Sequence, residues 1–223
     1  MITKRLIVNA LTFARVPLIL LWAVVAIVTQ LNLARLSTLA AIVWAFVAGG
    51  AMFLAAITDL FDGKLARKWG VVSALGKMAD PLMDKVFFIV TFPTLLWQAL
   101  MVGGEGAMLH GVVLLLFTML YMLRDTWVTF LRSVGSLYGA DVAAMWIGKV
   151  RTALSFPAAG WIYAYLSLSP QIPLTNHAAT LTVRCWFFSC LAIEVFLIAL
   201  TLWTLFVYTA SYAPYVKKAL ERK

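Results

Sequence analysis

Residues 59–84 read DLFDGKLARKWGVVSALGKMADPLMD and join two long apolar runs. Four of the chain's nine acidic residues fall within this stretch: Asp59, Asp62, Asp80 and Asp84. Carboxylates beside a membrane-spanning segment are costly and therefore predict a functional site. Small residues and one arginine lie between them. The stretch predicts two membrane helices whose adjoining ends hold a site for divalent cations and phosphates.

The composition of the whole chain indicates an integral membrane protein. Of its 223 residues, 64% are hydrophobic and 12% are charged, and the mean hydropathy is +0.96. A soluble domain of this size could not bury so much apolar surface in one core. The net charge of +9 fits loops that face an anionic leaflet. We expect no nucleic-acid partner, because no basic domain stands outside the apolar segments.

Apolar stretches long enough to cross a bilayer as helices occur six times. They are predicted at 10–29, 36–58, 84–102, 108–130, 146–167 and 185–209. Lysines and arginines gather at both chain ends and in alternate loops, so the positive-inside rule places both termini and the acidic stretch in the cytoplasm. We expect an all-α protein of one domain, residues 1–223, with six transmembrane helices. A bacterial inner membrane fits this short chain.

Spacing places the acidic residues on two helical stripes. Side chains three or four positions apart share one face of a helix. By this rule Asp59 and Asp62 lie on one stripe beside two small residues, and Gly76, Asp80 and Asp84 form a second. The carboxylates of each stripe can hold a cation, and the small residues let a flat group approach the backbone.

A turn at residues 68–75 is predicted to fold the two stripes toward each other. Four carboxylates around one pocket repel strongly unless a cation neutralises them. A ligand set of oxygen atoms favours Mg²⁺ or Mn²⁺ over zinc. An alternative stays open for Asp80, because Asp followed by Pro81 is also typical of a helix N-cap.

The complete pattern resembles the signature of the CDP-alcohol phosphotransferase family: Asp59-x-x-Asp62-Gly63-x-x-Ala66-Arg67, eight residues, then Gly76-x-x-x-Asp80-x-x-x-Asp84. The resemblance implies six membrane helices with a polar cavity open to the cytoplasm, and a homodimer. It also implies an enzyme, a transferase in which a hydroxyl displaces CMP from a CDP-linked lipid or alcohol and forms a phosphodiester.

The resemblance also implies roles for these residues. The metal-binding residues would be Asp59, Asp62, Asp80 and Asp84. The general base that accepts the proton of the attacking hydroxyl would be Asp84. Residues at the CDP donor would be Asp62, Gly63, Ala66, Arg67 and Gly76. A diphosphate adds negative charge to the four carboxylates, so two Mg²⁺ or Mn²⁺ ions are expected rather than one.

Four segments resemble those of bacterial phosphatidylglycerophosphate synthases: Asn9-x-x-Thr12-x-x-Arg15, Asp80-Pro81-Leu82-Met83-Asp84-Lys85, Arg124-Asp125 with Arg132, and Trp146-Ile147-Gly148-Lys149-Val150-Arg151-Thr152. This implies CDP-diacylglycerol as donor, sn-glycerol 3-phosphate as acceptor, and a donor contact for Asn9 and Thr12. A phosphorylated acceptor needs cations, which we predict to be Arg124, Arg132, Lys149 and Arg151. Asp125 departs from the pattern, in which Glu usually follows the arginine.

Alternatives remain for the acceptor and for the class of protein. Inositol phosphate is the nearest rival acceptor, and phosphatidylglycerol, serine and choline are others. Arg132, Lys149 and Arg151 could instead serve only to orient the chain in the membrane. A cation transporter would also carry carboxylates in membrane helices, but near the bilayer midplane and often within inverted repeats. The sequence shows neither feature.

Overall fold

The computed structural model describes residues 2–71, 74–140, 146–173 and 177–221, which form six long α-helices, two short 3₁₀ helices and no β-strand. The long helices are α1 (Ile2–Leu31), α2 (Thr38–Trp69), α3 (Ala74–Val102), α4 (Gly104–Leu137), α5 (Trp146–Leu168) and α6 (His177–Glu221). The 3₁₀ helices are η1 (Leu33–Arg35) and η2 (Ser169–Gln171). The prediction of an all-α fold is confirmed.

Five of the described helices, α1, α2, α3, α4 and α6, are long and apolar enough to cross a membrane. The exception is α5, predicted as a span at 146–167, because Arg151, Pro157 and several hydroxyl-bearing residues lower its hydropathy. The chain is therefore an integral membrane protein, and its sixth span stays a prediction. With 34 and 45 residues, α4 and α6 exceed the ~20 needed to cross the hydrocarbon core.

The chain reverses between α2 and α3, within the segment predicted to turn. Gly70 ends α2 with φ +62°, a left-handed conformation that glycine adopts without a Cβ penalty. Helix α3 then begins at Ala74, so Asp80 and Pro81 lie inside it. The alternative that Asp80 caps a helix is wrong, because the helix starts more than one turn earlier.

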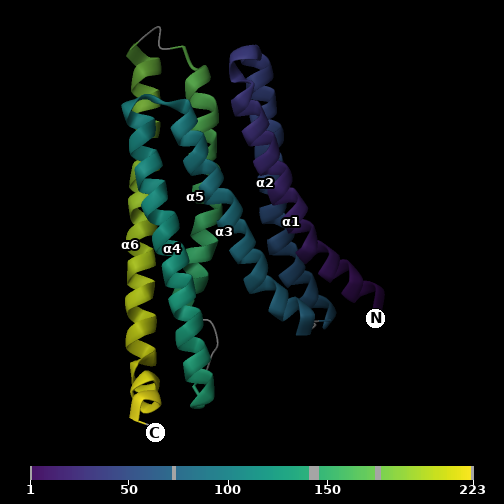
Figure 1. Ribbon diagram of the computed structural model, residues 1–223. Coiled ribbons are helices and arrows are strands. Elements are labelled where there is room, and N and C mark those ends of the chain that lie inside the picture. The colour runs from purple at the N-terminus through teal and green to yellow at the C-terminus, as the bar shows by residue number, and fades with distance from the viewer. Residues whose placement is uncertain (1, 72–73, 141–145, 174–176, 222–223) are drawn as a thin grey trace.

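Figure 1 shows α4, α5 and α6 together on one side, α1 and α2 on the other, and α3 between them. Both chain ends lie at the same end of the bundle, which we call the terminal end. Helix α1 packs against both α2 and α3, and α4 packs mainly against α6 and α3. Direct contacts between α2 and α3 are few among the described residues. Side chains from these two helices therefore meet through α1.

The buried core is aromatic where α3, α4 and α5 meet. The rings of Phe87 and Phe156 stack with centroids 3.8 Å apart, and those of Phe88 and Tyr121 with centroids 3.7 Å apart. Large apolar side chains are also exposed along the bundle, as expected for a surface that faces lipid. This core fixes α3 against the two helices that carry the predicted acceptor residues.

One ionisable pair lies deep in the bundle at the other end. His110 of α4 and Glu194 of α6 are 0% and 1% exposed, and His110 Nδ1 lies 2.9 Å from each carboxylate oxygen. Tyr165 and Phe187 pack against the imidazole ring. The pair joins two neighbouring helices inside an apolar environment and is remote from the acidic stretch in sequence.

Candidate functional site

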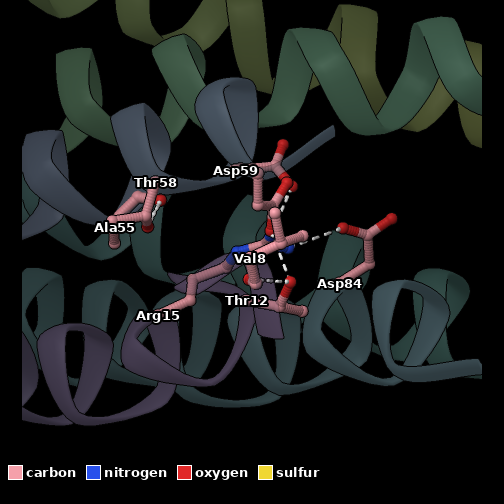
Figure 2. Close-up of polar contacts among 8 residues, drawn as sticks. Val8, Thr12, Arg15, Ala55, Thr58, Asp59 and Asp84 are labelled. Carbon is pink, nitrogen blue, oxygen red and sulfur yellow. Dashed lines mark hydrogen bonds and ion pairs between the residues drawn. The ribbon is translucent and has the colours of Figure 1, made fainter. Parts of the chain in front are cut away.

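The acidic side chains of α2 and α3 converge on one arginine of α1. Arg15 is completely buried and forms ion pairs with Asp59, with Asp62 at 3.1 Å and with Asp84 at 3.6 Å. Figure 2 shows the Arg15 guanidinium reaching between Asp59 on one side and Asp84 on the other. We call Asp59, Asp62, Asp84 and Arg15 the acid cluster. Its three carboxylates come from two helices that barely touch.

Helix α1 presents Arg15 inward because its apolar residues follow a helical period. Val8, Thr12, Arg15, Ile19 and Trp22 recur at intervals of three or four residues, and each is at least 94% buried. The hydroxyl of Thr12 lies 2.8 Å from Asp62 Oδ2 and 3.2 Å from the Val8 carbonyl. One stripe of α1 therefore packs the bundle and also orients a carboxylate of α2.

The acid cluster matches part of what spacing predicted. Asp59, Asp62 and Asp84 do approach one point, but the two stripes meet through Arg15 rather than face to face. Arg15 itself was not among the predicted site residues. An arginine inside an apolar helix, in register with Thr12, was a signal that could have identified it. The side chain of Asp80 lies outside the described residues.

The residues predicted near the donor surround this cluster unevenly. Thr12 is buried at Asp62, Asn9 is half-buried, and both Ala66 and Gly76 are partly exposed. A Cβ on Gly63 would lie 3.5 Å from the Arg67 guanidinium. The exposed side chain of Arg67 therefore folds back over Gly63, one turn earlier in α2. Beyond the buried Asp62, the residues Gly63, Ala66 and Arg67 are thus partly or fully exposed toward the end of α2.

A large apolar cavity begins at Asp59 and runs between α2 and α5. Its volume is about 680 Å³, and its lining includes Gly49, Phe53, Pro157 and Gly160. Asp59 is the one charged side chain among the described residues of this lining. About a third of its side chain is exposed, as is also the case for Asp84, whereas Asp62 is buried. The cavity therefore offers an apolar channel that ends at an anionic group.

Two buried arginines form a second polar centre, between α4, α5 and α6. Arg124 is 5% exposed, donates from Nε to Thr204 Oγ1 at 3.1 Å, and lies 4.8 Å from the centroid of the Tyr208 ring. Arg151 is 3% exposed, with its guanidinium carbon 4.3 Å from the centroid of the Tyr121 ring. Aromatic faces attract such cations but do not neutralise them.

These arginines retain donors that no described residue uses. Arg124 Nη2, and both Nε and Nη1 of Arg151, are buried without a hydrogen-bond partner in the described part of the chain. Unsatisfied buried donors are unfavourable unless a ligand or water completes them. A Cβ on Gly148 would lie 3.6 Å from Arg124 Nη2 and 3.0 Å from the Tyr208 hydroxyl. A side chain at this position would therefore crowd the Tyr208 hydroxyl beside Arg124.

The surroundings of the other predicted basic residues, Arg132 and Lys149, are known in less detail. Arg132 is partly exposed on α4, two turns beyond Arg124, and has an interaction of its own. The side chain of Lys149 lies outside the described residues. Asp125 does not pair with its neighbour Arg124; its Oδ2 lies 3.0 Å from Lys85 Nζ on α3. Lys85 and Asp125 thus join the helices that carry Asp84 and Arg124.

The acid cluster has the ligand chemistry of a site for a hard divalent cation. Carboxylate oxygens are the preferred ligands of Mg²⁺ and Mn²⁺. Among the described residues, no three His, Cys, Asp or Glu side chains are arranged as a ready-made metal site. In the cluster, Arg15 supplies the positive charge to which the carboxylates turn. The carboxylate oxygens are suitable ligands for a metal ion. The same oxygens also form the ion pairs with Arg15.

A family model described as CDP-alcohol phosphatidyltransferase matches residues 5–184. The chain therefore belongs to the CDP-alcohol phosphatidyltransferase family, as the acidic signature predicted.

Two bacterial proteins illustrate the likeness, and both are named CDP-diacylglycerol--glycerol-3-phosphate 3-phosphatidyltransferase. The one from Salmonella typhimurium (strain LT2) is 34% identical over 122 residues, which cover 53% of this chain and 62% of that protein. The one from Escherichia coli (strain K12) is 32% identical over 124 residues, covering 54% and 63%. The chain thus spans less than two thirds of these relatives. No solved structure matches it.

Proposed function

We propose that this protein transfers a phosphatidyl group from CDP-diacylglycerol to sn-glycerol 3-phosphate and releases CMP. The observation that carries the choice of a phosphorylated acceptor is the pair of buried arginines with unused donors, Arg124 and Arg151. They supply charge and hydrogen bonds for an anionic group such as a phosphate monoester. The names of the two bacterial relatives are consistent with this acceptor.

The acid cluster and the apolar cavity would bind the donor. An acyl chain of CDP-diacylglycerol would lie in the cavity between α2 and α5, with the diphosphate at Asp59, where the lining becomes charged. Because the acyl chain comes from the hydrocarbon of the bilayer, the apolar lining would match the environment that the chain leaves. Near the end of α2, Gly63, Ala66 and Arg67 would flank the cytidine and its phosphates, together with Asn9, Thr12 and Gly76.

Metal binding is assigned to Asp59, Asp62 and Asp84, with Asp80 as the fourth carboxylate. We expect two Mg²⁺ or Mn²⁺ ions, because a diphosphate adds charge to an already acidic site. Bound there, the ions would neutralise the diphosphate and stabilise the departing CMP. Thr12 would keep Asp62 in place through the hydrogen bond from its hydroxyl.

Asp84 would accept the proton of the attacking hydroxyl. The acceptor oxygen would bond to the lipid-linked phosphorus while the bond between that phosphorus and the CMP oxygen breaks. A carboxylate has too low a pKa to remove an alcohol proton in advance, but it can take the proton as the new bond forms. The ion pair of Lys85 with Asp125 would hold α3, which carries Asp84, against α4, which carries Arg124.

The acceptor phosphate would lie against Arg124 and Arg151, with Lys149 and Arg132 as further cations at the edge. Gly148 would keep the position beside Arg124 and Tyr208 free of a side chain. By the positive-inside rule, the terminal end and both centres would face the cytoplasm of a bacterium, where a water-soluble acceptor is available. A homodimer in the inner membrane remains part of this proposal.

The test is CMP release by the purified protein in detergent, with Mg²⁺ or Mn²⁺ and CDP-diacylglycerol. Acceptors are supplied singly: glycerol 3-phosphate, inositol phosphate, phosphatidylglycerol, serine and choline. We expect release with glycerol 3-phosphate alone, and its loss in Asp84→Asn. Release with a different acceptor would refute the acceptor assignment while keeping the chemistry.

A second comparison isolates the acceptor site. Arg151→Met should raise the KM for glycerol 3-phosphate by about 100-fold, because it removes a charged hydrogen-bond partner worth roughly 1.5–3 kcal/mol. Its matched control, Arg35→Met, removes the same charge from an exposed position in η1. Equal effects of the two substitutions would contradict the proposed role of Arg151.

A further inference from the structure

We infer that Arg15 is a built-in counter-ion that competes with divalent cations for the acid cluster and thereby weakens metal binding in the absence of donor. The inference rests on the proposed metal role of Asp59, Asp62 and Asp84. Arg15 would be a positioning residue. Its guanidinium would neutralise the carboxylates until metal ions, bound together with the donor, replace it as their counter-charge.

The contacts of Arg15 indicate that the guanidinium and the three carboxylates stabilise each other. The guanidinium is completely buried, and three carboxylates from α2 and α3 are its ion-pair partners. A buried cation without counter-charge is unfavourable, and so are several carboxylates grouped around no cation. Arg15 also bridges two helices that have few direct contacts. Removing it would leave a concentration of negative charge between α2 and α3.

The same contacts bring Arg15 into conflict with a metal. Asp62 Oδ2 already lies 3.1 Å from Arg15 Nη2 and 2.8 Å from the Thr12 hydroxyl. A divalent ion on this oxygen would stand close to the guanidinium, and like charges at such separations repel strongly in a poorly solvated site. A metal therefore binds at the expense of the contacts of Arg15 with Asp59 and Asp62.

Arg15 has donors left for a new partner. Its Nε and Nη1 are buried and have no hydrogen-bond partner among the described residues, although Nη1 lies 3.6 Å from Asp84. A diphosphate oxygen could accept from them once metal ions hold the carboxylates, since guanidinium groups bind phosphate through paired N–H donors. Exchange of partners would couple the binding of metal to the binding of donor: metal binds weakly alone and tightly together with a diphosphate.

The decisive measurement is the Mn²⁺ affinity of purified protein in detergent without donor, followed by electron paramagnetic resonance of free Mn²⁺. Arg15→Gln should bind Mn²⁺ about tenfold tighter than wild type, because the competing charge is gone. The control, Arg5→Gln, is the same substitution at an exposed position of the same helix and should stay within about twofold. Unchanged or weaker binding by Arg15→Gln would overturn the inference.

Two further variants keep the outcome clear. Asp59→Asn should weaken Mn²⁺ binding; an affinity equal to wild type would instead refute the metal role of the cluster, and the Arg15 inference with it. Arg15→Lys covers the case in which Arg15→Gln does not fold. An ammonium group keeps the competing charge but cannot contact three carboxylates as a planar fork does, so Mn²⁺ should bind tighter than in wild type, though by less than the tenfold expected without the charge. Equal or weaker binding by this variant would count against the inference.

Coupling to the donor gives an independent readout. In wild type, cytidine diphosphate should increase Mn²⁺ affinity, since the nucleotide offers Arg15 a new partner. In Arg15→Gln the increase should be several-fold smaller. An equal increase in both proteins would show that Arg15 does not take part in the coupling.

Discussion

Replacing Gly135 with alanine should destabilise the contact between α4 and α6 at the terminal end. A Cβ at this position would lie 2.5 Å from Tyr212 Cε1, 2.7 Å from Tyr212 Cδ1 and 3.0 Å from the Ala140 Cβ. Tyr212 is 4% exposed and belongs to a buried cluster with Val128 and Leu131. Its ring cannot move aside without disturbing that cluster.

The size of the effect follows from two opposing terms. Forcing an additional carbon into a packed core costs about 1–3 kcal/mol. Alanine in a helix is favoured over glycine by about 1 kcal/mol, which offsets part of this cost. A net loss of about 1 kcal/mol should lower the Tm of a chain of this size by roughly 2–4 °C. Thermal unfolding in detergent, followed by tryptophan fluorescence, measures the change.

Gly160→Ala is the matched control. It places the same methyl group in a helix where nothing lies within 4 Å of the new Cβ. Its Tm should equal that of wild type or exceed it slightly, because alanine is the better helix former. If Gly135→Ala melted together with Gly160→Ala, the close approach of α4 and α6 described here would be wrong.

Two further substitutions test buried polar contacts. His110→Leu should lower the Tm sharply, because it leaves the Glu194 carboxylate buried without a partner, at a cost of about 3–5 kcal/mol. The double variant His110→Leu with Glu194→Leu should recover most of that loss. A double variant less stable than the single one would contradict this account. Thr12→Val should weaken Mn²⁺ binding about fivefold, because Asp62 loses a hydrogen bond worth about 1 kcal/mol, while Thr12→Ser should bind as wild type does.

Spacing along the chain predicted which carboxylates share a face, but not what lies opposite them. Asp59 and Asp62 lie one turn apart on α2, and this local relation is fixed by the helix itself. The position of Arg15 depends on how α1 packs across α2 and α3. That packing depends on the shape of side chains such as Trp22, which periodicity does not describe. The structure therefore adds the cation to a cluster of which the sequence revealed only the anions.

A similar reason explains the partners of Arg124. Its neighbour in the chain, Asp125, carries the opposite charge. Adjacent residues of a helix point about 100° apart, so the two side chains meet different helices. Arg124 contacts Thr204 on α6, while Asp125 reaches Lys85 on α3. Neighbours in sequence were poor guides here, and only the assembled bundle identifies the partners.

Helix lengths were underestimated for a different reason. Predicted spans cover only the apolar part of a helix, since hydropathy marks the limits of the bilayer rather than those of the helix. Helix α6 starts at His177 and runs to Glu221, well beyond the predicted 185–209. Its last turns contain alanine, lysine and leucine, which favour a helix in water as well. The acidic stretch shows the same effect, since α3 begins ten residues before the predicted span.

The cavity between α2 and α5 is bordered by Phe46 and Phe53, whose rings are 67% and 66% exposed on the outer surface of the bundle. An opening on that surface communicates with the bilayer rather than with water. A lipid held there exchanges with neighbouring lipids by lateral diffusion. Turnover would then follow the mole fraction of donor among those lipids, not its amount per volume, so adding inert detergent at constant donor would slow the reaction.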